Sequence, residues 1–114
     1  MTRTTASSVP PQIGAALLAL TAGHGELLSE SSRAWRSVTF SGHRVTALIR
    51  YAGVEAAIMG EALLEELAET EVHRLDKAML ADLAIRSVLR ESRPVATLTI
   101  EFEAVTLDVP QELS

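Results

Sequence analysis

Residues 77–109 contain two runs of alternating apolar residues on either side of the turn-forming sequence Glu-Ser-Arg-Pro at positions 91–94. The first run carries Met79, Ala81, Leu83 and Ile85, and the second carries Leu98, Ile100 and Phe102. Alternation with a period of two is typical of strands that bury one face. The segment therefore predicts a long antiparallel hairpin, against which the other elements must pack.

The apolar pattern also predicts how the two strands of this hairpin pair. If Arg90 faces Val95 across the turn, Leu83 lies opposite Phe102, and the apolar residues of both strands share one face. Beyond that point the apolar positions of the second strand change from even to odd numbers. One inserted residue would return them to the same face, so we predict a β-bulge near residues 103–104.

Two helices are expected before and after a shorter hairpin. The first runs from about residue 11 to residue 29 or 32, with an interruption at Gly23-His24-Gly25, because each glycine lowers helix stability by roughly 1 kcal/mol relative to alanine. The second covers residues 54–70, where apolar residues share one face of the helix and glutamates lie on the other. One face of this helix is expected to pack on the sheet.

The shorter hairpin is predicted between the helices, with strands at residues 34–40 and 44–51. Gly42-His43 would form a two-residue turn, because a type II′ turn favours glycine at its first central position. This register places Trp35 opposite Arg50 on one face of the sheet. Phe40 and Val45 would then form a pair on the other face.

Together the elements predict an α+β fold in the order α-β-β-α-β-β, with a four-stranded antiparallel sheet, a long C-terminal hairpin and both helices packed on one face. A single domain is expected at residues 10–110. Residues 1–9 are rich in threonine and serine without periodicity and predict a disordered tail. Residues 111–114 predict a second short tail.

Composition excludes several classes of function. The formal net charge of −5 argues against nucleic acid or an anionic membrane as the main partner. The chain has no cysteine, no pair of histidines with metal-ligand spacing and no nucleophile elbow. We therefore expect no metal, no cofactor and no catalytic residues, which favours a protein that is not an enzyme.

An apolar run at residues 13–22 superficially resembles part of a secretory signal. Pro10, Pro11 and the single basic residue before the run argue against that interpretation. The run is also shorter than the roughly 20 residues that span a membrane. We therefore expect a cytoplasmic protein, and no motif assigns it to a family.

Histidines offer one possible ligand site. His24 precedes Glu26 at the helix interruption, and His73 precedes Asp76 before the long hairpin. A pocket formed by these four residues at the end of the sheet would suit a small-molecule binder or a minor enzyme. The alternatives are a simple helix kink at His24 and a solvated surface cluster around His73, while His43 is expected to be exposed in a turn.

The second face of the predicted sheet mixes apolar and charged residues. An open antiparallel face usually carries polar residues, and a sizeable apolar patch commonly marks a partner site. A two-fold axis would let this patch cover its own copy. We therefore expect a non-catalytic homodimeric interaction protein, although the first helix folded across this face would instead leave a monomer. The expected interface residues are Trp35, Leu48, Arg50, Leu80 and Arg86.

Charged residues are segregated along the chain. Residues 33–50 contain four arginines and no acidic residue, whereas the following helix carries glutamates and no basic residue. This separation either attracts a partner or second subunit, or is compensated within one copy. The predicted register also opposes Asp82 and Glu103, a like-charge pair that Arg86 or the bulge would relieve.

Overall fold

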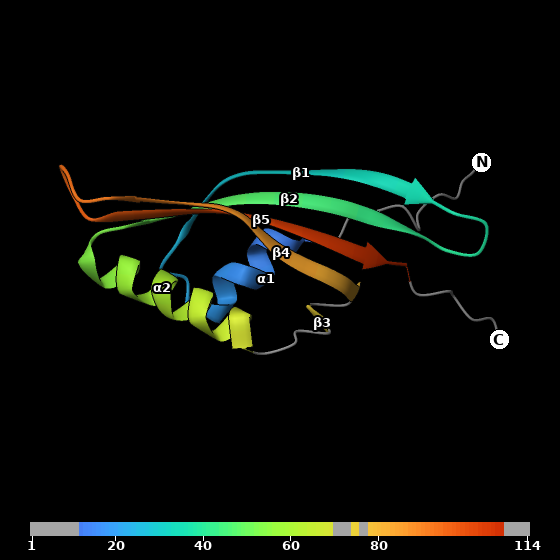
Figure 1. Cartoon of the computed structure of the whole chain (residues 1–114), viewed down its shortest axis with the longest axis horizontal. Helices are drawn as coiled ribbons and strands as arrows, with labels where there is room; N and C mark the ends of the chain where they lie inside the picture. The colour runs from blue at the N-terminus through green and yellow to red at the C-terminus, as the bar shows by residue number, and fades with distance from the viewer. Residues whose placement is uncertain (1–11, 70–73, 76–77, 109–114) are drawn as a thin grey trace.

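A computed structural model describes residues 12–69, 74–75 and 78–108. One antiparallel sheet has the strand order β1-β2-β5-β4-β3, and both helices lie on the same side of it (Figure 1). The predicted α+β order with four long strands and a long C-terminal hairpin is confirmed, and a two-residue strand extends one edge. The expected tails lie outside the described residues. The elements are α1 (Ile13–Leu20), β1 (Glu26–Arg36), β2 (Ser41–Ala52), α2 (Val54–Glu69), β3 (Arg74–Leu75), β4 (Ala78–Glu91) and β5 (Thr97–Leu107).

Strand β5 lies at the centre of the sheet and alternates regularly along its whole length. Every even-numbered residue from Leu98 to Thr106 is buried, so the predicted bulge at residues 103–104 is wrong. The bulges lie in β4 instead, between Leu80 and Asp82 and between Ile85 and Ser87. An extra residue in β5 would disturb its ladders with both β2 and β4, whereas β4 pairs with β3 through only two residues.

These bulges change the pairing of the long hairpin. Ile85 faces Phe102 and Leu83 faces Ala104, so the predicted pairing of Leu83 with Phe102 is wrong. Residues 92–96 form the connection, which is longer than predicted, because Glu91 pairs with Thr97. The bulge after Leu80 turns this side chain towards the helices, where only 6% of it is exposed.

Helix α1 ends much earlier than the sequence suggested. Ala22 and Gly23 have φ angles of 54° and 77°, and the Gly23 N–H donates to the Leu18 carbonyl at 3.0 Å. Left-handed residues at this point terminate a helix and satisfy its last carbonyls. The predicted helix to residue 29 or 32 is therefore wrong, and strand β1 begins at Glu26.

The β1–β2 connection lies at residues 37–40, before the predicted turn at Gly42-His43. Gly42 is inside β2, where an added Cβ would lie 1.8 Å from the Thr106 carbonyl oxygen, so glycine permits a close approach of β5. His43 is only 3% exposed, contrary to the expected solvated turn residue. The resulting register pairs Trp35 with Gly42 and Glu26 with Arg50.

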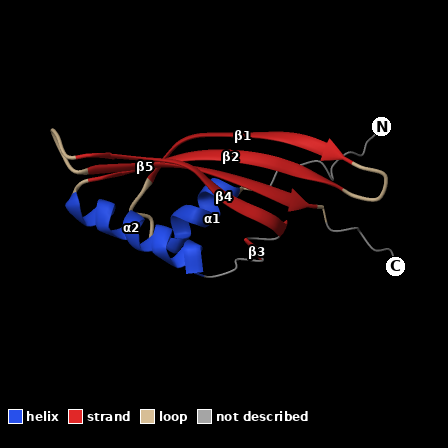
Figure 2. Ribbon diagram, in the orientation of Figure 1, coloured by secondary structure: helices blue, strands red, loops and turns tan. Residues whose placement is uncertain are grey.

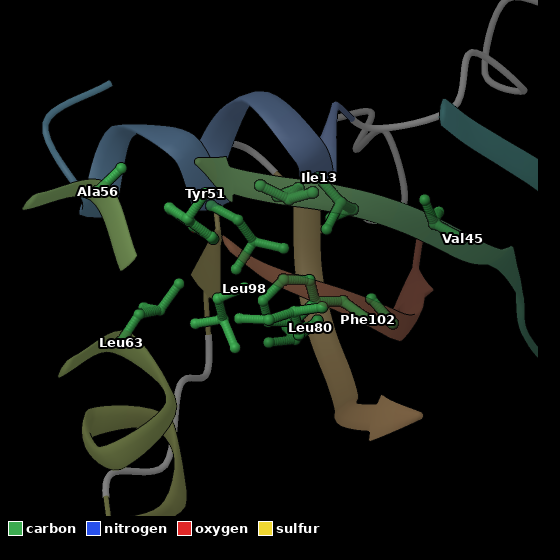
Figure 3. Packing of buried hydrophobic residues seen from close by; sticks show 12 residues of the cluster. Ile13, Val45, Tyr51, Ala56, Leu63, Leu80, Leu98 and Phe102 are labelled. Atoms are coloured by element: carbon green, nitrogen blue, oxygen red, sulfur yellow. The ribbon is translucent and has the colours of Figure 1, made fainter. Parts of the chain in front are cut away.

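The hydrophobic core fills the layer between the sheet and the two helices (Figure 3). Tyr51 lies fully buried in it, and burial raises the pKa of its phenol, an effect that the neighbouring Thr21 side chain partly opposes. Helix α2 packs on β2 and β5, as predicted from its apolar face. The N-terminus of α1 is held by Glu30, whose carboxylate accepts hydrogen bonds from the Ile13 and Gly14 N–H groups at 3.2 and 3.3 Å.

Candidate functional site

The side of the sheet opposite the helices, here called the outer face, is the candidate functional site. No described helix covers it (Figure 2). Side chains alternate between the two sides of a strand, so the buried residues of β2 and β5 identify their neighbours as outer-face residues. Pairing then assigns the outer residues of β1 and β4. Its larger side chains are Glu26, Arg33, Trp35, Arg44, Thr46, Leu48, Arg50, Arg86, Leu89, Glu101, Glu103, Val105 and Leu107.

An ion-pair cluster crosses the middle of the outer face. Glu103 on β5 contacts Arg44 on β2, with Oε2 at 3.2 Å from Nη1, and Arg86 on β4, with Oε1 at 2.5 Å from Nη1. The Glu103 side chain is 15% exposed, whereas the two arginine side chains are 55% and 58% exposed. Arg86 lies in the second bulge of β4, and this bulge places it beside Glu103.

The predicted opposition of Asp82 and Glu103 is absent, because the bulges place Asp82 opposite Val105. Hydrogen bonds from Arg86 and then Arg44 hold the pKa of Glu103 below its usual range. The cluster contains two guanidinium groups and one carboxylate. Glu101 on the same strand supplies a second carboxylate, and its charge also acts on Arg86.

The lowered pKa of Glu103 predicts a pH-dependent contribution to stability. A carboxylate with a lower pKa in the folded state stabilises that state above the unfolded pKa, and this contribution disappears as the pH falls through the folded pKa. Wild-type protein should therefore be more stable than Glu103→Gln near neutral pH, and the difference should vanish well below about pH 4. Urea unfolding across this pH range measures the effect. The same difference in stability between the two proteins at neutral and at acidic pH would contradict this role for Glu103.

Two further polar contacts lie on the outer face. Glu26 accepts a hydrogen bond from Arg50 at 2.9 Å, and Glu101 accepts one from the Ser87 hydroxyl at 3.3 Å. Apolar side chains lie among them, including Leu48, which is half-buried, and Leu89, which is 55% exposed. The face consequently alternates between charged and apolar groups.

Trp35 lies on the outer face at the end of β1. Its ring lies against Gly42, where an added Cβ would be 3.0 Å from Cζ2. The indole Nε1 is buried and has no hydrogen-bond partner among the described residues. A buried donor without a partner costs about 1–3 kcal/mol, so an acceptor from outside would stabilise this arrangement.

The structure places four of the five predicted interface residues on the outer face. Trp35, Leu48, Arg50 and Arg86 all belong to it, whereas Leu80 lies in the core opposite Thr106. Gly42, the partner of Trp35, is separated from Arg50 by eight residues along β2, or roughly 26 Å at about 3.3 Å per residue. The predicted pairing of Trp35 with Arg50 is therefore wrong.

The predicted histidine pocket is only partly visible. His24 is exposed in the α1–β1 connection, and Glu26 pairs with Arg50 at the edge of the outer face. His73 and Asp76 lie outside the described residues. The small-molecule pocket stays a prediction.

A partly buried polar cluster at the other end of the sheet was not anticipated from the sequence. The Ser41 hydroxyl donates to Asp108 Oδ2 at 2.9 Å, and His43 Nδ1 lies 3.7 Å from Asp108 Oδ1. A catalytic triad places histidine between the hydroxyl and the carboxylate, whereas here the carboxylate lies between the other two groups. Ser41 and His43 are two residues apart, which places them on the same face of a strand. This shared face was missed from the sequence because Gly42 was assigned to a turn rather than to a strand.

Neither a metal site nor a membrane-spanning helix is present in the described part of the chain. No group of three or more potential metal-ligating side chains occurs among residues 12–69, 74–75 and 78–108. None of the helices there combines the length and apolar character needed to cross a bilayer.

Comparisons with protein-family models, curated proteins and solved structures found no match to this chain.

Proposed function

We propose that this chain is a non-catalytic interaction protein that forms a homodimer through the outer face. One observation carries the proposal: both helices lie on one side of the sheet, while the opposite side presents apolar residues uncovered by any described helix (Figure 2). Open antiparallel faces usually carry mainly polar side chains. Half-buried Leu48, Val105 and Leu107 and exposed Leu89 thus support an association surface.

The dimensions of the molecule suit a second copy as the partner. Its four long strands have 11–14 residues, so the sheet face measures roughly 36–46 Å by roughly 19 Å, close to the roughly 800 Å² that each partner buries in a standard interface. Two-fold symmetry places the same patch on both sides of the interface. We propose a cytoplasmic location for this dimer, on the sequence features given above.

The charged residues of the outer face also support a second copy of the chain as the partner. The Arg44–Glu103–Arg86 cluster and neighbouring Glu101 place both signs of charge on the outer face, and Glu101 accepts a hydrogen bond from the Ser87 hydroxyl and acts on Arg86 through its charge. A two-fold rotation near this point would bring Glu101 of each copy towards the arginine cluster of the other. Such complementarity favours one orientation and excludes like-charge contacts.

Lysine substitution on the outer face tests the homodimer. Leu48→Lys combined with Leu89→Lys should raise the dimer dissociation constant by at least about a hundredfold, because two buried charges would lack partners. Sedimentation equilibrium measures this constant. Val95→Lys, at an exposed position of the β4–β5 connection, provides a matched control and should leave it unchanged. A monomeric wild type, or a double variant that remains folded and dimeric, would overturn the proposal.

A further inference from the structure

The β1–β2 hairpin ends in a projecting group of apolar and basic side chains, here called the hairpin tip (residues 33–40). Val38 is 100% exposed and Phe40 is 59% exposed. The loop that carries them is ordered by hydrogen bonds from the Ser37 N–H to the Phe40 carbonyl at 2.7 Å and from the Phe40 N–H to Ser37 Oγ at 3.1 Å. The apolar side chains are therefore presented by a preformed turn.

The hairpin tip also carries positive charge that is not compensated among the described residues. Arg33 and Arg36 are exposed, and neither forms an ion pair with another described residue. Arg33 faces Arg44 across the strands, and Arg44 is already paired with Glu103. The arginine-rich segment is thus only partly neutralised within one copy, at Arg44 and Arg50.

The exposed side of α2 has the complementary chemistry. Val54 and Ile58 are 66% and 61% exposed, and Ala62 continues this apolar stripe along the same side of the helix. Exposed glutamates accompany the stripe, and none has an ion-pair partner in the described part of the chain, unlike Glu61, which pairs with Arg90. These glutamates are Glu55, Glu65 and Glu66.

We infer that the hairpin tip of one copy binds the exposed side of α2 in a second copy. Apolar groups would meet apolar groups, and arginines would meet glutamates. Figure 1 shows the β1–β2 tip at the opposite end of the molecule from the start of α2, so one copy cannot make this contact with itself. Two different surfaces are joined, and such a contact continues from copy to copy in a ring or filament.

This contact differs from the proposed sheet-face dimer, because it joins the hairpin tip to α2, although Arg33 and Trp35 of the tip also belong to the outer face. Variants are therefore made in the Leu48→Lys, Leu89→Lys background and compared by sedimentation velocity at low salt. Arg33→Glu with Arg36→Glu should weaken self-association at least about tenfold, and so should Glu65→Arg with Glu66→Arg. Arg93→Glu reverses an exposed arginine in the β4–β5 connection, outside both surfaces, so it controls for the reversal of one charge and should have no effect.

Mixing provides the sharper test. Both charge-reversed chains should remain folded by circular dichroism, and an equimolar mixture should recover the association lost by each alone, because glutamate tips then meet arginine helices. Failure of the mixture to recover association, or no loss on either reversal, would overturn the inference. A third outcome would also overturn the inference. The parent chain would not self-associate but would bind phosphatidylserine vesicles, and Arg33→Glu with Arg36→Glu would abolish that binding. A lipid surface would then be the partner of the hairpin tip.

Discussion

Replacing Phe102 with alanine should lower the free energy of unfolding by about 3–5 kcal/mol. Phe102 is completely buried in the central strand β5, with Ala47 on one side and Ile85 on the other (Figure 3). Its removal leaves a cavity that neighbours on a rigid central strand cannot fill. Since small domains are stable by only about 5–15 kcal/mol, urea unfolding should show a large shift in midpoint.

Ile85 is the matched control for Phe102, because the two residues face each other in the sheet. It lies on β4 and is 38% exposed. Ile85→Ala should therefore cost only about 1–2 kcal/mol, since part of its surface is already in contact with water. Equal losses for the two variants would show that the core is not centred on β5.

Gly60→Ala should destabilise the protein by about 1–2 kcal/mol, although alanine favours helices by about 1 kcal/mol over glycine. An added Cβ would lie 2.7 Å from Leu98 Cδ2 and 2.8 Å from Tyr51 Cδ1. The tyrosine ring cannot simply move away, because it is fully buried and its other edge lies close to the backbone of Gly25, where even an added Cβ would lie 2.7 Å from Cε2. Close packing of α2 on the sheet therefore outweighs the gain in helix propensity.

The control is the reverse exchange at an exposed position of the same helix. Ala62→Gly removes only helix propensity and should cost about 1 kcal/mol. Thermal or urea unfolding should thus show that both substitutions destabilise, whereas propensity alone predicts opposite signs. A stabilised Gly60→Ala variant would mean that α2 lies farther from Tyr51 than this packing requires.

Elements with a clear apolar period could be predicted from the sequence. Helix α2 repeats its apolar residues with helical spacing, and the long hairpin alternates with a period of two, so both were placed within a few residues. The bulges were misplaced because Val105 and Leu107 suggested a slip in β5. These two residues lie on the outer face, where apolar side chains break the simple alternation of buried and polar positions.

The strand predicted at residues 34–40 overlaps only the end of β1 (Glu26–Arg36), because residues 26–33 make contacts that no local sequence pattern reveals. Glu30, in the middle of a serine-rich stretch, faces α1 and caps its N-terminus from 17 residues away in the chain. A bulge between Leu27 and Ser29 also interrupts any alternation. Such a strand is defined by its partners in the fold rather than by its own apolar period.

The candidate site was predicted in outline but not in detail. An apolar second face followed from the alternation of residues, and Leu48 and Trp35 do belong to it. Leu80 was wrongly assigned to that face. The unpredicted bulge after Leu80 reverses the side of the sheet on which the preceding residues of β4 lie. The Arg44–Glu103–Arg86 cluster likewise depends on a bulge, which the sequence does not mark.

Distances between two copies test the outer-face dimer most directly. The chain has no cysteine, so Thr46→Cys on the outer face and Ala62→Cys on α2 each allow a single spin label per copy. Sheets that pack face to face lie about 10 Å apart, whereas the α2 positions would be separated by both sheets and both helix layers. Pulsed electron paramagnetic resonance should therefore give a shorter distance between labels at position 46 than at position 62. Absence of dipolar coupling at position 46, or a shorter distance at position 62, would contradict an outer-face dimer.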